Sequence, residues 1–109
     1  MFSESVKEKQ LKTTFITSTT ATSPISITID LSKYSFLILR VANTTATSIY
    51  GSDIIPVDTL VEGAIYNILR YFNVLSGNFT GSLKYISGNS FQIYTSNSGY
   101  LVEVYGIEK

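Results

Sequence analysis

Apolar and polar residues alternate along much of the chain. The clearest case is residues 25–30, where isoleucines at every second position are separated by polar residues. Successive side chains of a β-strand point to opposite faces, so this alternation predicts a strand with one buried face. Residues 34–42 are instead apolar at most positions of both parities. We expect them to form a central strand that is covered on both sides, in part by another subunit.

Further strand-forming runs follow at intervals of roughly ten residues. Gly51 interrupts one of them and predicts a bulge or bend. Residues 64–73 also fit helical spacing, but their Tyr, Ile, Phe and Asn content and the flanking Gly63 and Gly77 favour a strand. The predicted strands are 11–18, 25–29, 34–42, 48–56, 64–73, 82–86, 91–95 and 100–107.

Short turn-forming segments connect the last three predicted strands. Residues 87–89 (SGN) predict that the two strands on either side of them pair. Residues 96–99 (SNSG) predict a closing hairpin between 91–95 and 100–107, because Asn and Gly tolerate the positive φ of a tight reversal.

Tyr100 and Tyr105 have opposite parity on the last predicted strand. One of them therefore faces a core and the other a second surface. We expect that second surface to contact a sister subunit.

About eight strands without alternating helices predict an all-β fold. We expect an antiparallel β-sandwich, jelly-roll-like, with about eight strands. The 109 residues fit one domain. Residues 11–109 form the sandwich, and residues 1–10 form an N-terminal arm. The charged sequence of the arm is typical of a solvated tail or a short helical turn, and it also suits an arm that contacts a neighbouring subunit.

The composition restricts the chemistry. The chain has neither histidine nor cysteine, which excludes a Ser-His-Asp triad, a Cys-His pair and imidazole or thiolate metal sites. Eight basic and eight acidic residues cancel, and charged residues make up 15% of the chain, against about 25% in average domains. This balance disfavours a nucleic-acid partner. No membrane span, metal or cofactor is predicted from the sequence.

Three acidic residues, Asp53, Asp58 and Glu62, lie close together in sequence around Pro56. A pair of carboxylates across a cleft would suit a glycosidase, and a cluster would suit calcium. The alternative is turn capping by Asp58 and ordinary loop solvation. Their spacing matches no known calcium loop, so we predict no catalytic residue and no metal ligand.

The tyrosines are the remaining candidates for binding. Tyrosine suits half-wet interfaces and sugar stacking, although half-buried tyrosines are also routine in sandwiches. Tyr66 and Tyr71 differ in parity, as do the two near the C-terminus, so some tyrosines must point outward. A subunit interface is the simplest use for outward tyrosines. The eight are Tyr34, Tyr50, Tyr66, Tyr71, Tyr85, Tyr94, Tyr100 and Tyr105.

Four segments in order resemble the small β-sandwich domains of tailed-phage structural proteins, of the tail-fibre, baseplate or head-fibre type. They are residues 27–38 (ITIDLSKYSFLI), 54–57 (IIPV), 63–66 (GAIY) and 102–107 (VEVYGI). The resemblance implies a homotrimer that acts in virion structure or host-surface recognition, with no shared catalytic residues. Phage fibres normally carry a long N-terminal shaft, whereas about ten residues precede the first strand here. This departure predicts an excised tip domain or a small stand-alone virion protein.

The expected function is therefore that of a non-enzymatic phage virion protein in a fibre, baseplate or capsid decoration. Its expected partners are itself, with a trimer favoured, other virion proteins and a host cell-surface glycan. Its expected location is the virion, after synthesis in the bacterial cytoplasm. The alternative is a carbohydrate-binding module of a bacterial or phage surface protein. A third hypothesis is a small glycan hydrolase that uses Asp53, Asp58 or Glu62.

Overall fold

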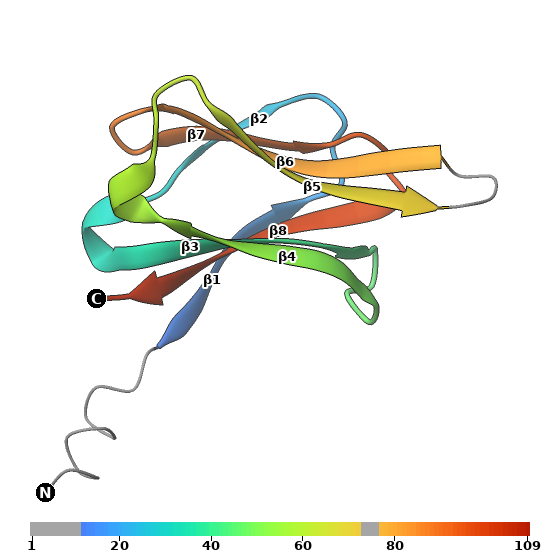
Figure 1. The fold of residues 1–109 in the computed structure, drawn as a ribbon, viewed down its shortest axis with the longest axis horizontal. Coiled ribbons are helices and arrows are strands. Elements are labelled where there is room, and N and C mark those ends of the chain that lie inside the picture. Colours follow the sequence, from blue (N-terminus) through green and yellow to red (C-terminus); the bar gives the residue numbers. More distant parts are fainter. Residues whose placement is uncertain (1–11, 73–76) are drawn as a thin grey trace, which may run out of the picture.

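The protein is a sandwich of two antiparallel sheets, which we describe from a computed structural model for residues 12–72 and 77–109. Figure 1 shows the two layers one above the other. Sheet A contains β1 (Thr13–Thr19), β8 (Tyr100–Glu108), β3 (Tyr34–Asn43) and β4 (Ile49–Pro56), in that order. Sheet B contains β2 (Ile25–Thr28), β7 (Ser90–Thr95), β6 (Gly77–Ser87) and β5 (Ile65–Phe72).

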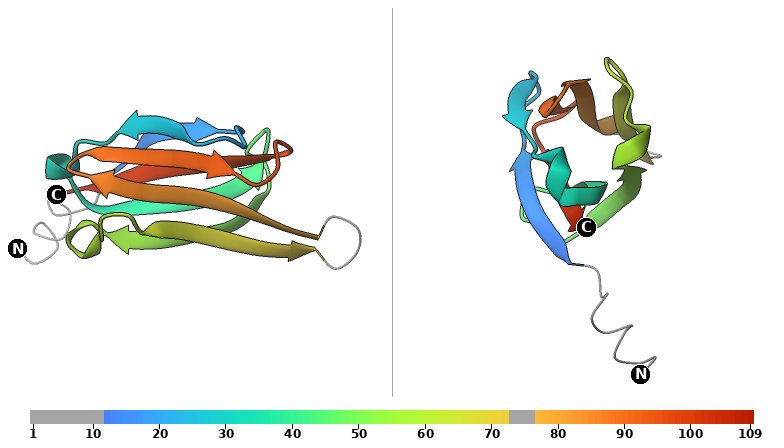
Figure 2. Two further views of the ribbon diagram at one scale, coloured as in Figure 1. Left: turned by 90° about the horizontal axis from the view of Figure 1, so that it is seen from above. Right: turned by 90° about the vertical axis from the view of Figure 1, so that its left-hand side faces the viewer.

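The predicted all-β, antiparallel sandwich of eight strands is confirmed. Strands from the two ends of the chain pair with each other, β1 with β8 and β2 with β7, as they do in a jelly roll (Figure 2). The β3–β4 and β5–β6–β7 neighbours are consecutive along the chain. The short 3-10 turns η1 (Leu31–Lys33) and η2 (Val57–Thr59) supply the helical residues of the described ranges. No helix there is long and apolar enough to cross a membrane.

Most of the local predictions hold. The bulge at Gly51 is confirmed, because the register of β3 with β4 shifts so that Tyr50 is the extra residue between Gly51 and Ile49. The run at 64–73 is a strand, β5. The predicted pairing across residues 87–89 is also confirmed, although β6 starts at Gly77 rather than at Ser82. The predicted N-terminal arm lies outside the described residues.

The predicted closing hairpin is wrong. β7 belongs to sheet B and β8 to sheet A, so residues 96–99 carry the chain from one sheet to the other. The Asn97 side chain accepts a hydrogen bond from the Gly99 amide at 2.8 Å, and the Ser96 amide donates to the Thr80 carbonyl at 3.0 Å. Residues 96–99 do form a turn, as their sequence predicts. However, β8 pairs along one edge with β1 and along the other with β3, so no edge of β8 remains for β7.

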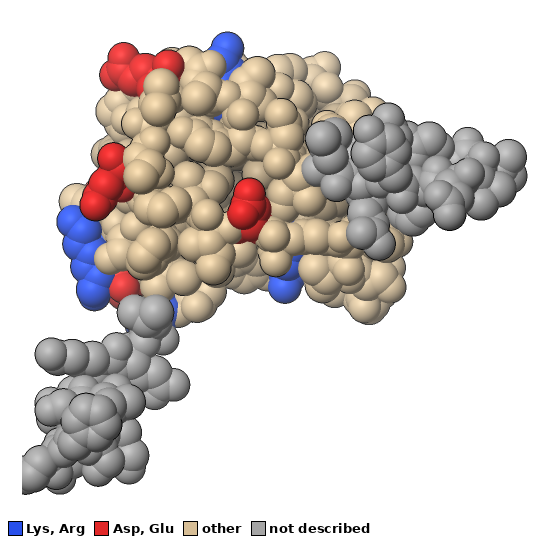
Figure 3. All heavy atoms as spheres, viewed as in Figure 1, with Lys and Arg blue, Asp and Glu red and all other residues tan. Residues whose placement is uncertain are grey.

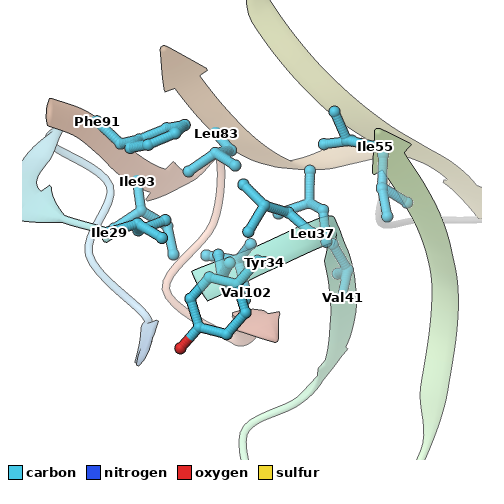
Figure 4. Packing of buried hydrophobic residues seen from close by; sticks show 12 residues of the cluster. Ile29, Tyr34, Leu37, Val41, Ile55, Leu83, Phe91, Ile93 and Val102 are labelled. Atoms are coloured by element: carbon cyan, nitrogen blue, oxygen red, sulfur yellow. The ribbon is translucent and has the colours of Figure 1, made fainter. Parts of the chain in front are cut away.

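The inner faces of the two sheets enclose the core (Figure 4). Leu83 and Ile93 of sheet B lie opposite Leu37 and Val102 of sheet A, and all four are fully buried. Burial of such side chains is the main stabilising term for the fold. The buried cluster consists of Ile29, Tyr34, Leu37, Leu39, Val41, Ile55, Ile68, Leu83, Phe91, Ile93, Val102 and Val104.

Gly81 on β6 marks a close approach of the two sheets. A Cβ atom at this position would overlap the Cγ2 atom of Val41 and lie 2.9 Å from Cγ2 of Val102. Both valines are fully buried in sheet A. The position therefore requires glycine for lack of space.

We expect Gly81→Ala to lower the free energy of unfolding by about 1–3 kcal/mol through overpacking. The same change in a Val41→Ala background should cost less, because the methyl group that it would overlap is gone. Urea denaturation of the four proteins measures both costs. Equal costs in the two backgrounds would contradict this account of the contact.

Candidate functional site

The outer face of sheet A, which we call face A, is largely apolar. Cross-strand pairing aligns its residues in straight rows across all four strands. One row consists of Phe15 on β1, Tyr105 on β8, Ile38 on β3 and Ile54 on β4. Its two end residues are well exposed, Phe15 at 52% and Ile54 at 57%. Large apolar side chains on this face are therefore exposed in the part of the chain that the structure describes.

The neighbouring rows are also largely apolar, and within them Ile107 and Ala42 are buried. Towards one end of the sheet lies a row of Thr13, Ile107, Phe36 and Pro56. Towards the other end, beyond one polar row, lie Leu101, Ala42 and the exposed Ile49. The predicted second cover over β3 is not supplied by the described residues, whose two sheets leave this side of β3 without a layer above it.

The polar row holds the charged residues of face A. It consists of Ser18, Glu103, Arg40 and Ser52. The Arg40 guanidinium donates through Nε to the Glu103 carboxylate at 2.7 Å and through Nη2 to the Tyr105 hydroxyl at 2.7 Å. The Tyr105 hydroxyl in turn donates to Glu103 at 3.2 Å. These three side chains form a closed hydrogen-bonded triangle on the two central strands.

Burial affects the electrostatics of this triangle. Glu103 is only 5% exposed although it lies on an outer face. Its hydrogen bond to Arg40 raises the pKa of the guanidinium, which keeps Arg40 charged. Burial raises the pKa of the Tyr105 phenol, and the nearby Glu103 carboxylate adds to that rise. Arg40 also lies against the Tyr105 ring, 4.9 Å from its centroid.

The outer face of sheet B has a different character. Where the side chains are described, two of its rows read Ile65, Lys84, Gln92, Ser26 and Asn67, Ser82, Tyr94, and Ile65 is 46% exposed. Ser82 donates to the Asn67 side chain at 2.6 Å. A polar outer face of this kind is what water-exposed antiparallel sheets normally have.

Figure 3 shows a flank of the molecule, with β4 and β5 in front, on which charged side chains are few.

The structure does not bring the predicted acidic residues together into a site. Asp53 lies on β4, where its carboxylate accepts a hydrogen bond from the Ile54 amide. Asp58 lies in η2, which has no side-chain capping hydrogen bond. The Thr59 hydroxyl donates a hydrogen bond to the Pro56 carbonyl oxygen. Glu62 lies in the connection to β5, and all three acids are exposed. Within residues 12–72 and 77–109, no three His, Cys, Asp or Glu side chains cluster to hold a metal ion.

Most tyrosines serve the core. Tyr34 is in the buried cluster, and four more pack against it: Tyr50, Tyr66, Tyr85 and Tyr100. The predicted division of the last strand is confirmed, because Tyr100 faces the core while Tyr105 lies on face A. Tyr94 lies on the outer face of sheet B. The side chain of Tyr71 lies outside the described part.

Sequence reasoning missed Phe15, Arg40 and Glu103 as members of one surface. Arg40 and Glu103 are 63 positions apart in the chain, and their pairing depends on the register of β3 with β8. The alternation within each strand does indicate which side chains share a face. It does not indicate which strands are neighbours.

Comparison with known proteins identifies no matching family model, no matching curated protein and no matching solved structure.

We expect the Tyr105 phenol to ionise above the ordinary tyrosine pKa of about 10. Because the pKa is raised in the folded state, its contribution to stability is complete below about pH 10 and is lost as pH rises through the folded-state pKa. The ultraviolet titration difference between the wild type and Tyr105→Phe reports that pKa. A difference curve centred at or below the ordinary value would contradict the described environment of Tyr105.

Proposed function

We propose that this protein is a non-enzymatic, homo-oligomeric structural protein of a tailed-phage virion, in a tail fibre, baseplate or capsid decoration. The observation that carries the proposal is face A, an apolar sheet surface with large exposed side chains. The phage part of the proposal rests on the resemblance of residues 27–38, 54–57, 63–66 and 102–107.

An apolar face of this kind supports a role in an assembly. Contiguous apolar patches on monomeric proteins are small, and larger ones mark binding surfaces. The opposite outer face, on sheet B, is polar and acts as an internal comparison. Formal net charge zero gives little repulsion between copies. A protein with one exposed apolar face and no net charge is suited to packing against other subunits in a larger particle.

The available side chains support a binding role over catalysis. The chain has no histidine or cysteine, and the acids proposed for a hydrolase are exposed and form no cluster of three within the described residues. The charged pair on face A is held by hydrogen bonds within the chain. A structural role requires no catalytic side chains and is compatible with a charged pair that is bonded within the chain. Host-surface recognition would be a further role of the same particle.

The proposal predicts that the chain is a constituent of the particle. Mass spectrometry of particles purified from a culture infected by a phage that carries this gene should detect it at a constant ratio to the major structural proteins. Washing with high salt should leave the ratio unchanged, since apolar contacts are not screened by salt. A chain abundant in the lysate but missing from washed particles would contradict the proposal.

A carbohydrate-binding module is the second candidate. The exposed ring of Phe15 lies beside Tyr105, with ring centroids 5.4 Å apart and an edge-on angle of 74°. Arg40 and Glu103 lie next to Tyr105 and offer polar groups. An exposed aromatic ring near hydrogen-bonding side chains is a combination that suits a sugar.

A glycan array tests the second candidate. If the protein binds a glycan through face A, we expect Phe15→Ala to weaken binding about tenfold. Tyr94→Ala is the matched control, because that aromatic residue lies on the outer face of sheet B. An array without any bound glycan, or equal effects of the two substitutions, would remove the second candidate.

A further inference from the structure

We infer that face A packs against face A of a second copy of this chain, about a two-fold axis that runs parallel to the strands between β3 and β8. This inference rests on the proposed assembly role and names the partner for it. It is carried by the order of the strands and by the arrangement of apolar and charged residues in the rows of face A.

The centre of sheet A lies between β8 and β3, because the strand order is β1-β8-β3-β4. A two-fold axis along that line places β8 of one copy over β3 of the other, and β1 over β4. Positions along the strands are unchanged by such an axis. Each row of face A therefore meets the same row of the second copy, read in reverse order.

The apolar rows remain apolar when reversed. Tyr105 meets the partner's Ile38 at the centre, and Phe15 meets the partner's Ile54 at the margin. In the next row, the half-buried Phe36 lies over the partner's Ile107, which is only 9% exposed. The four exposed ends of the central row, two from each copy, are thereby covered by apolar partners.

The row that contains Arg40 and Glu103 makes the two copies complementary in charge. Arg40 and Glu103 are directly paired across β3 and β8, so the axis places each of them over its opposite charge in the second copy. Ser18 likewise meets the partner's Ser52. The Arg40 side chain is 29% exposed and uses two of its five N–H donors within the chain. It retains donors for a hydrogen bond to the second copy, while the Glu103 side chain, at 7% exposure, is largely enclosed within its own copy.

The other possible occupants fit less well. The one cation and one anion in the four rows cancel, so face A has no net charge with which to select an acidic or a basic partner. Sheets that pack face to face cross at about 30° and about 10 Å apart. The crossing displaces the corners most, while the central residues Arg40, Glu103, Ile38 and Tyr105 stay opposed. Two-fold pairing therefore favours a dimer over the trimer that the phage resemblance implies.

A single substitution at the margin tests the pairing without touching the core. We expect the wild type to be a dimer at micromolar concentration by sedimentation velocity, and Ile54→Lys to weaken the dimer at least about tenfold. The control is Ile65→Lys, an equal change at a 46% exposed position on the outer face of sheet B. It should leave the dimer unchanged. Circular dichroism confirms that each variant is folded.

Charge exchange tests the symmetry itself. In Arg40→Glu both central charges become negative, and in Glu103→Arg both become positive, so each variant alone should be a monomer. Mixing the two should restore a dimer, because every charge then meets its opposite in the other copy. If either variant fails to fold alone, the comparison of Ile54→Lys with Ile65→Lys still decides the question.

Several outcomes would overturn the inference. They are a wild-type monomer at all concentrations, a mass of three copies, equal effects of Ile54→Lys and Ile65→Lys, and folded charge variants that do not combine on mixing. A monomeric chain that is found in washed particles would overturn this pairing and leave the proposed function standing. A dimeric chain missing from particles would do the reverse.

Discussion

The position of β8 between β1 and β3 determines both faces of sheet A. Its inner side chains, Val102 and Val104, are fully buried, and Val102 lies at the close approach of the sheets around Gly81. Pairing along both edges of β8 fixes the register of the two neighbouring strands. The same pairing therefore closes the core on one side and aligns the rows of face A on the other. A one-residue slip of β8 would exchange its buried and outward side chains.

The local part of this fold could be predicted from the sequence, and the long-range part could not. Alternation within residues 25–29, the bulge at Gly51 and the opposite facing of Tyr100 and Tyr105 follow from backbone geometry within one strand. The turn at 96–99 indicates that the chain reverses, but not whether it returns to the same sheet. That choice depends on partners of β8 that lie far away in the sequence. The Arg40–Glu103 pair was beyond sequence reasoning for the same reason.

Face A contributes unequally to the stability of the isolated chain. The half-buried Ile38 and Tyr105 gain cover from their neighbours, whereas Phe15 and Ile54 are more than half exposed and gain little from folding alone. Their apolar area is available for an intermolecular contact. Sheet B presents Lys84, Gln92 and similar residues at equivalent positions, so an apolar outer face is not a requirement of the sandwich itself.

A charged pair in the middle of an apolar face needs its own physical explanation. An isolated charge would oppose docking, because it would lose its water without compensation. Arg40 and Glu103 are already paired and hydrogen-bonded to Tyr105 before any contact forms, which reduces that cost. The pair then penalises wrong alignments more than it strengthens the right one. A shift by one row would move the guanidinium from Glu103 to Leu101 or to Tyr105 of the other copy, so that it no longer faces the opposite charge. The polar row thus selects one alignment of two surfaces that are otherwise uniformly apolar.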